Sequence, residues 1–385
     1  MENKLKKFLL ERESNMLFRE LTTISSLKQG KILVNDNEFI NFSSNDYLGL
    51  TSHSEILNSL KSSDLSIYSS ASSRLMTGSS PIHEQLEKMT ARFKGKEESL
   101  VFTSGYQANV GIISALCGKD DVIFLDKLSH ASIVDGVILS GAKYFRFRHN
   151  DMDHLEELLS KERPKHGASL IVTETVFSMD GDIAPLKQIT VLKNKYDSML
   201  MVDEAHATGI FGKNGAGITE ELGLEKSCDI IMGTFSKALG GFGAYIACSS
   251  LIKNYLVNTC RSFIYTTSLP LSIIKTDITA LEIIKNEPER RKVLRDNFRL
   301  FRSRLEEYGI KTIGESQIVP VVIGSLDKLS RVSNKLKDLG YWVTPVKPPT
   351  VPEKTSRLRI SLSYNHGVEI LERFAVDLAV ILDKI

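Results

Sequence analysis

The sequence lacks a charge imbalance, long apolar runs and any cysteine pattern, and each of these absences excludes a class of protein. Its 385 residues carry a formal net charge of only +2, which gives no electrostatic reason to expect nucleic acid or an acidic membrane surface as a partner. No uninterrupted apolar run approaches the ~18 residues that a membrane span needs. We therefore expect a protein with no nucleic acid and no membrane among its partners.

Cysteine patterning is the third absence. The four cysteines form no C-x-x-C pair and have no regular spacing, which argues against a zinc site or a disulfide framework. The N-terminal apolar run of three residues is too short for a signal peptide. We interpret the cysteines as reduced core thiols of a cytoplasmic protein without a metal site; they are Cys117, Cys228, Cys248 and Cys260.

What the chain does contain is an alternation of strands and helices. Between about residues 45 and 270, segments of helical period separate six apolar, β-rich runs, namely SLVFTS, DVIFLD, KYFRF, SLIVTE, SMLMVDE and DIIMGTF. This alternation predicts an α/β fold, in which βα units build a mostly parallel central sheet with helices on both faces.

The two ends of the chain show sequence patterns that differ from that of the middle part. Leu5, Phe8 and Leu9 predict an N-terminal amphipathic helix, and the runs KILVN and EFINF predict a short hairpin after it. From residue 271 to residue 308 the pattern is helical, and strands and helices of a small α+β region follow. We predict an N-terminal helix and hairpin segment, a large domain and a smaller C-terminal α+β domain, at residues 1–44, 45–270 and 271–385.

The long helical stretch carries a row of arginines that could suggest nucleic acid. The row consists of Arg291, Arg295, Arg299 and Arg302. Apolar residues of the same period line another face, namely Leu294, Phe298, Phe301 and Leu305. This combination favours an amphipathic helix whose arginine face is solvated.

Residues 203–206 spell Asp-Glu-Ala-His, a signature of nucleic-acid helicases. A helicase of this kind also needs the phosphate-binding loop G-x-x-x-x-G-K-[ST]. The chain has four Gly-Lys pairs, and none is followed by Ser or Thr. The motor interpretation is therefore excluded.

A different chemistry suits the same residues. Asp203 ends a buried strand, and Lys237 follows the next apolar strand in the glycine-rich stretch GTFSKALGGFG. A lysine and a carboxylate at neighbouring strand ends suit pyridoxal phosphate, because the lysine forms a Schiff base and the carboxylate keeps the pyridine nitrogen protonated. Either residue alone is weak evidence, but their order and spacing together favour this cofactor.

The motifs around these residues resemble those of the α-oxoamine synthases, which are fold-type-I pyridoxal-phosphate (PLP) enzymes. The resemblance runs from about residue 15 to the C-terminus, and the motifs occur in the family's order. They are NFSSNDYLGL, TSGYQAN, DKLSHASIVDG, TETVFSMDGDIAPL, VDEAHATGIFGKNGAG, GTFSKALGGFGAY, FIYTTSLP and PPTVPEKTSRLRISL.

The resemblance implies catalytic roles for residues near the cofactor ring. Lys237 resembles the Schiff-base lysine that also removes the α-proton, and Asp203 resembles the partner of the pyridinium. His206 and Ser178 resemble ligands of the phenolic oxygen. His130 resembles the imidazole that stacks on the ring and helps to position the acyl group.

The resemblance also implies a phosphate site. The backbone amides of Gly105 and Tyr106 begin a helix, and a helix N-terminus binds anions. Thr234 adds a hydroxyl. Thr266 and Thr267 resemble residues that reach the phosphate from the other subunit, which implies a homodimer with active sites at its interface.

Substrate-binding residues follow from the same comparison. Arg359 resembles the arginine that binds the amino-acid carboxylate, since the guanidinium fork matches a carboxylate bidentately. Arg357, on the same face of the strand, is interpreted as structural. Asn45 resembles a residue near that carboxylate, Arg19 one that lines the acyl entrance, and Thr350 one that contacts substrate.

The implied reaction is the decarboxylative condensation of an amino acid with an acyl thioester. NFSSNDYLGL and PPTVP favour the branch of biotin biosynthesis, which joins L-alanine to a pimeloyl thioester of acyl carrier protein or coenzyme A. Glycine C-acetyltransferase and other α-oxoamine synthases remain alternatives, because they share the fold and the cofactor. SSASSRLM, Ala207 and PEKT depart from the family's pattern, and the first of them lies near the acyl path, which bears on the choice of acyl chain. A non-catalytic subunit is disfavoured, because such subunits lose the lysine.

Overall fold

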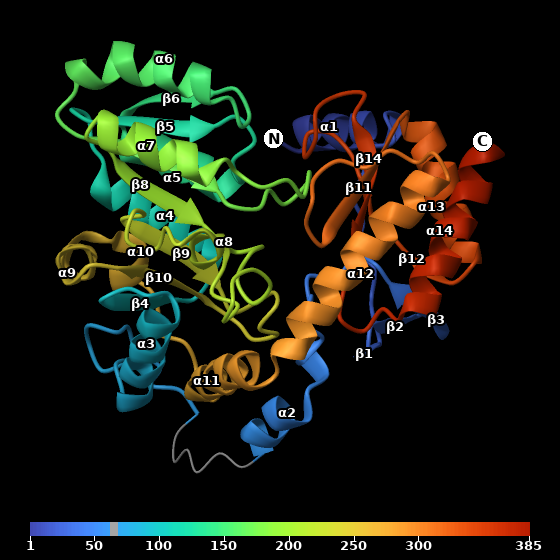
Figure 1. The fold of residues 1–385 in the computed structure, drawn as a ribbon, viewed down its shortest axis with the longest axis horizontal. Coiled ribbons are helices and arrows are strands. Elements are labelled where there is room, and N and C mark those ends of the chain that lie inside the picture. The colour runs from blue at the N-terminus through green and yellow to red at the C-terminus, as the bar shows by residue number, and fades with distance from the viewer. Residues whose placement is uncertain (62–67) are drawn as a thin grey trace. The chain divides into compact units, whose positions relative to one another are not determined.

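A computed structural model describes residues 1–61 and 68–385, and the chain divides into two compact units (Figure 1). Unit 1 comprises residues 1–45, 179–181 and 294–385, and unit 2 comprises residues 46–178 and 182–293.

These units have different boundaries from the predicted domains. The N-terminal hairpin groups with the C-terminal segment, because β12 (Tyr341–Trp342) pairs in parallel with β3 (Asn37–Asn41). The helix α11 (Leu271–Asn286) groups with the larger unit, because it packs on α2 (Ser54–Lys61) and α3 (Pro81–Phe93).

Unit 2 contains a seven-stranded sheet in the order β4-β10-β9-β8-β7-β5-β6. All strands are parallel except β10, which is antiparallel to both of its neighbours. Six strands match the six predicted runs, and β10 is an addition. The strands are β4 (Glu98–Phe102), β5 (Val122–Asp126), β6 (Lys143–Phe147), β7 (Ser169–Glu174), β8 (Met199–Asp203), β9 (Ile230–Thr234) and β10 (Ala244–Cys248).

Helices cover the sheet of unit 2 in front and behind (Figure 1). Alternate strand residues, such as Ile123 and Leu125 of β5, pack into one buried cluster with Ile112 of α4 and Ile133 of α5, as the period of two in a strand requires. The remaining elements of this unit are η1 (Leu50–Ser52), α4 (Gly105–Leu116), α5 (Ala131–Ser140), α6 (Met152–Glu162), η2 (Arg163–Lys165), α7 (Leu186–Lys195), α8 (Ile218–Leu222), α9 (Ser250–Thr259) and α10 (Arg261–Ile264).

Unit 1 contains two smaller sheets, in the orders β1-β2-β3-β12 and β11-β14-β13. The predicted single helical stretch over 271–308 is two helices, because Glu287 leaves the helix and Pro288 starts a new one, α12, which runs on into unit 1. The further elements are α1 (Glu2–Ser14), β1 (Ser26–Lys28), β2 (Lys31–Val34), β11 (Ile318–Gly324), α12 (Pro288–Glu307), α13 (Leu326–Asp338), β13 (Pro345–Val346), β14 (Ser356–Ser361) and α14 (Val368–Asp383).

The arginine row of α12 is less solvated than the sequence predicted. Leu294, Phe298, Phe301 and Leu305 are buried, so the apolar face is confirmed. Arg291, however, is buried and donates to the carbonyl of Ile284. Arg302 donates to the carbonyls of Ser316 and Ile318, and burial lowers its pKa to about 10. The solvated interpretation is wrong for these two side chains, which hold backbone in place.

All four cysteines are buried and free, as predicted. Burial raises the pKa of Cys117, Cys228 and Cys248 to about 12, so these thiols stay protonated. Within the described residues there is no cluster of His, Cys, Asp and Glu that could hold a metal ion. In the same part of the chain, no helix combines the length and the apolar character needed to cross a bilayer.

Candidate active site

A cavity of about 190 Å³ lies in unit 2, where residues that follow β4, β5, β7, β8 and β9 meet. Parallel strands end at one edge of their sheet, which is where open α/β sheets bind ligands. Most of the predicted cofactor residues line this cavity, namely Gly105, Tyr106, His130, Asp203, His206, Thr234 and Lys237.

Lys237 is linked to a histidine and a tyrosine. Its Nζ lies 2.8 Å from Nε2 of His206, and Nδ1 of His206 lies 2.7 Å from the hydroxyl of Tyr47. An ammonium can only donate, so a protonated Lys237 makes Nε2 the acceptor and places the imidazole proton on Nδ1, facing Tyr47. Tyr47 is fully buried. It lies within the motif NFSSNDYLGL, but the sequence offered no signal that it reaches His206.

Asp203 is a buried carboxylate with neutral partners. Its Oδ2 accepts a hydrogen bond from the Asn109 side chain at 2.9 Å, and its Oδ1 accepts one from the Ala205 amide at 2.8 Å. No lysine, arginine or histidine forms an ion pair with it among the described residues. A buried charge of this kind is costly unless a cation compensates it. The Asn109 Oδ1 is likewise buried without a partner in the described part.

Glu174 is a second buried carboxyl of the cavity, and the sequence analysis missed it. It ends β7 directly opposite Asp203 of β8, and its Oε1 accepts a hydrogen bond from the His130 amide at 2.7 Å. Burial, reinforced by Asp203, raises the pKa of Glu174 to about 8. A carboxylate at the end of a buried strand is the signal that revealed Asp203, and it would have revealed Glu174 too.

His130 caps α5 and also lines the cavity. Its Nδ1 accepts a hydrogen bond from the Ser132 amide at 3.3 Å and lies 2.8 Å from the Ser132 hydroxyl. Burial lowers the pKa of His130, with Asp203 acting in the opposite direction and Lys237 in the same one. Because Nδ1 accepts, the neutral ring carries its proton on Nε2.

The predicted phosphate site is the N-terminus of α4. Ser104 caps this helix by accepting a hydrogen bond from the Gln107 amide at 3.2 Å. The first amides of a helix have no intrahelical partner, so those of Gly105 and Tyr106 form a site suited to an anion. Thr234 is buried beside it and donates to the Gly243 carbonyl at 2.7 Å.

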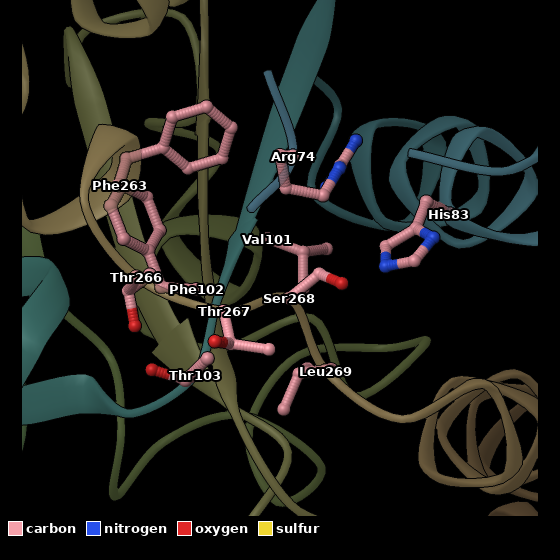
Figure 2. A pocket seen from close by; sticks show the side chains of 10 residues that line it. All are labelled: Arg74, His83, Val101, Phe102, Thr103, Phe263, Thr266, Thr267, Ser268 and Leu269. Carbon is pink, nitrogen blue, oxygen red and sulfur yellow. The ribbon is translucent and has the colours of Figure 1, made fainter. Parts of the chain in front are cut away.

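Three predicted cofactor residues do not line this cavity. Thr266 and Thr267 line a separate, smaller pocket of unit 2, together with Arg74 and His83 (Figure 2). Ser178 is half-buried in the segment that follows β7.

Two pairs of predicted substrate residues are brought together within unit 1. Arg359 of β14 is 9% exposed and donates to the Asn45 side chain at 3.3 Å. Arg19 donates to the Thr350 hydroxyl at 3.0 Å. Each pair joins residues that are more than three hundred positions apart in the sequence.

Arg357 differs from Arg359 in its partner. It is buried and forms an ion pair with Asp180, with the Nη1 and Oδ1 atoms 2.6 Å apart. It also donates to the Thr355 carbonyl at 3.0 Å. These bonds support the structural interpretation of Arg357.

The fold agrees with the family comparison. The model of the family described as aminotransferase class I and II matches residues 37–377, and the chain belongs to that family. A solved serine palmitoyltransferase from S. paucimobilis, with PLP and myriocin bound, superposes with a TM-score of 0.93 at 30% identity, covering 99% of this chain and 97% of that chain. The predicted fold-type-I PLP transferase fold is thereby confirmed.

Relatives with a higher sequence identity to this chain belong to one kind of α-oxoamine synthase. The 8-amino-7-oxononanoate synthase of Geobacter sulfurreducens is 43% identical over 369 residues, which cover 94% of each chain. The solved 8-amino-7-oxononanoate synthase from Francisella tularensis superposes with a TM-score of 0.77 at 30% identity, covering 90% of this chain and 98% of that chain. The resemblance that the motifs indicated is confirmed.

Proposed function

We propose that the chain is a PLP-dependent acyltransferase of biotin biosynthesis. It joins L-alanine to a pimeloyl thioester and yields 8-amino-7-oxononanoate, CO2 and the free thiol. The observation that carries this proposal is the cavity in which Lys237, His206 and Asp203 meet. The 43% identity to the Geobacter sulfurreducens synthase supports the choice of substrates.

The cavity residues fit PLP on their own chemistry. The buried Asp203 has no cationic partner in the described residues, so a protonated pyridine nitrogen would compensate its charge. The N-terminus of α4 would bind the phosphate, with Thr234 beside it. Lys237 would attach the cofactor covalently, and His206 and Ser178 would bind its phenolic oxygen.

Each residue of the cavity would then have a separate role in the reaction. When bound, PLP supplies an electron sink for the charge that develops at the α-carbon of the amino acid. Asp203 holds the proton on the pyridine nitrogen that this sink requires. Lys237 takes the α-proton of alanine, and the hydrogen bonds through His206 to Tyr47 orient its Nζ. His130, which lines the cavity, would position the acyl group.

Substrate recognition is assigned to unit 1. Arg359, held by Asn45, would bind the alanine carboxylate. Arg19 and Thr350 would contact the acyl chain.

We further propose a homodimer in which Thr266 and Thr267 serve the phosphate of the other subunit. The reduced, buried thiols suit the cytoplasm, and we propose neither nucleic acid nor membrane as a partner.

A second candidate is an α-oxoamine synthase that uses another amino acid and acyl donor. The likeness to serine palmitoyltransferase over almost the whole chain favours it. This candidate comes second, because the serine palmitoyltransferase is 30% identical to this chain, whereas the Geobacter sulfurreducens synthase is 43% identical.

Thiol release from three substrate pairs tests the proposal. The purified, PLP-loaded protein is given pimeloyl thioester with L-alanine, acetyl thioester with glycine, or palmitoyl thioester with L-serine. We expect release with the first pair alone and none from Lys237→Ala. Release with another pair and not with the first would move the function to that synthase.

A further inference from the structure

We propose that His149 is a positioning residue, whose doubly protonated ring ties the loop that carries His130 to the segment that carries Ser178. Its relevance to catalysis rests on the proposed function, whereas the tie itself follows from the geometry of unit 2.

The imidazole of His149 lies between two carboxylates. Its Nδ1 is 2.9 Å from Oδ1 of Asp126, and its Nε2 is 2.6 Å from Oδ2 of Asp182. The ring also stands edge-on to Phe177, with the centroids 4.5 Å apart and the planes at 90°. Ionised carboxylates only accept hydrogen bonds, so both ring nitrogens must donate and the ring is a cation.

Asp126 connects this cation to the His130 loop. It ends β5, is fully buried, and its Oδ1 also accepts a hydrogen bond from the Leu128 amide at 2.7 Å. Its backbone carbonyl accepts one from the Ser129 amide at 3.1 Å. The backbone between β5 and His130 is therefore positioned by the Asp126 carboxylate, which His149 contacts.

Asp182 connects the cation to the Ser178 segment. Its carbonyl accepts a hydrogen bond from the amide of Phe177, the residue before Ser178, at 3.0 Å. Val176 and Ile183 form an antiparallel bridge next to it. The Asn150 side chain also donates to Asp182, at 2.8 Å. Displacing Asp182 would therefore displace the backbone that presents the Ser178 hydroxyl.

Electrostatics keep His149 charged under physiological conditions. Burial alone would lower its pKa, but the hydrogen bonds and charges of Asp126 and Asp182, the two ionisable groups that face it within the described residues, raise the pKa to about 10. The tie is therefore intact at neutral pH and is lost as the pH rises through about 10.

The wild-type protein gives the first test. Histidine Cε1–H resonances of the full-length protein, with and without PLP, are followed from pH 6 to pH 11, and His149→Gln assigns the signal. We expect His149 to titrate near pH 10. Titration near the ordinary value of ~6.5 would overturn the proposal. This measurement does not depend on turnover, so it stays informative if the proposed reaction is wrong.

The second test compares His149→Gln with His154→Gln. His154 lies on α6 and accepts a hydrogen bond from the Arg148 amide, so it serves as a matched control. We expect His149→Gln to speed hydrogen exchange in residues 127–130 and 176–184 and to shift the absorbance of bound PLP. We also expect it to lower kcat by ~10- to 100-fold with a much smaller change in KM, because misplaced groups lose rate rather than ground-state affinity. Unchanged exchange in both segments would refute the tie, and changed exchange with unchanged absorbance and kcat would refute the positioning role.

Discussion

Asp203 and Glu204 are consecutive acidic residues, yet they have opposite surroundings. Glu204 is fully buried and forms an ion pair with the fully buried Lys94, with the Nζ and Oε2 atoms 2.8 Å apart. The Asp203 carboxylate lines the cavity and, within the described residues, accepts hydrogen bonds only from Asn109 and Ala205. One carboxylate therefore already has a buried cation beside it, and the other does not.

The difference separates a structural pair from a binding site. Lys94 also donates to the Thr208 hydroxyl and the Ala216 carbonyl, so its donors are saturated. Burial by itself would lower the pKa of Lys94, but Glu204 raises it, and the net direction is upward. A buried charge that has no opposite charge beside it therefore marks a candidate functional site.

The largest effect is expected for the lysine of the cavity. Lys237→Ala removes the proposed covalent attachment and the base, so turnover should fall by ~10⁴-fold. The melting temperature of the protein without PLP should stay close to that of the wild type, because Lys237 reaches a cavity rather than the packed core. Thiol release and mass spectrometry after borohydride reduction measure activity and attachment. A variant that still carries reduced cofactor would contradict the assignment.

The buried Lys94 should show the reverse. Lys94→Met leaves Glu204 charged and unpaired in the core, which should lower the free energy of unfolding by about 3–5 kcal/mol. Urea denaturation measures the loss. Lys88→Met is the control, since Lys88 is 67% exposed and should change little. Equal stabilities for the two variants would remove the contrast between Lys94 and Lys237.

A smaller contrast separates the two arginines of β14. Arg359→Lys removes the bidentate fork, so KM for L-alanine should rise by ~10-fold. Arg357→Lys keeps a cation beside Asp180 and should leave KM within about threefold. Steady-state kinetics with saturating thioester distinguish the two. A larger rise in KM for Arg357→Lys would reverse their assignment.

The smallest change in turnover is expected for Glu174→Gln, because glutamine keeps an oxygen that can accept the His130 amide. Its effect appears in stability instead. The folded-state pKa of Glu174, about 8, lies above the ordinary glutamate value of 4.5, so its stabilising contribution is present below pH 4.5 and is lost as the pH rises through 8. Unfolding of the PLP-free protein should therefore depend less on pH in the variant between pH 4.5 and pH 8. Parallel pH profiles would show that Glu174 ionises normally.

Much of the fold could be predicted because each parallel strand is a short apolar run bounded by polar residues. β10 was not predicted, because its sequence, AYIAC, follows a glycine-rich stretch and contains two alanines. This combination is more typical of a loop than of a strand. The break between α11 and α12 falls at Glu287, because Pro288 disfavours a helical conformation of the residue before it and is itself well tolerated at the start of a helix.

Site residues could be predicted where a side chain of suitable chemistry follows or ends an apolar strand, as for Asp203 and Lys237. Tyr47 could not be found, because it reaches His206 across 159 positions of sequence and only the fold brings them together. Asn109 lies one helical turn after Gly105 in α4, yet helical spacing alone does not single out its side chain from its neighbours.

Strand β10 makes the complete seven-stranded sheet a late product of synthesis. In the described sheet, β4 is joined to its other strands only through β10, and β4 leads directly into Gly105 and the anion-binding end of α4. As the chain leaves the ribosome, β4 emerges long before residues 244–248, and until then it pairs with no other strand of this sheet. A nascent chain that ends before β10 therefore lacks the strand that joins β4 to the rest of the sheet, so β4 can enter the sheet only after residues 244–248 have been made.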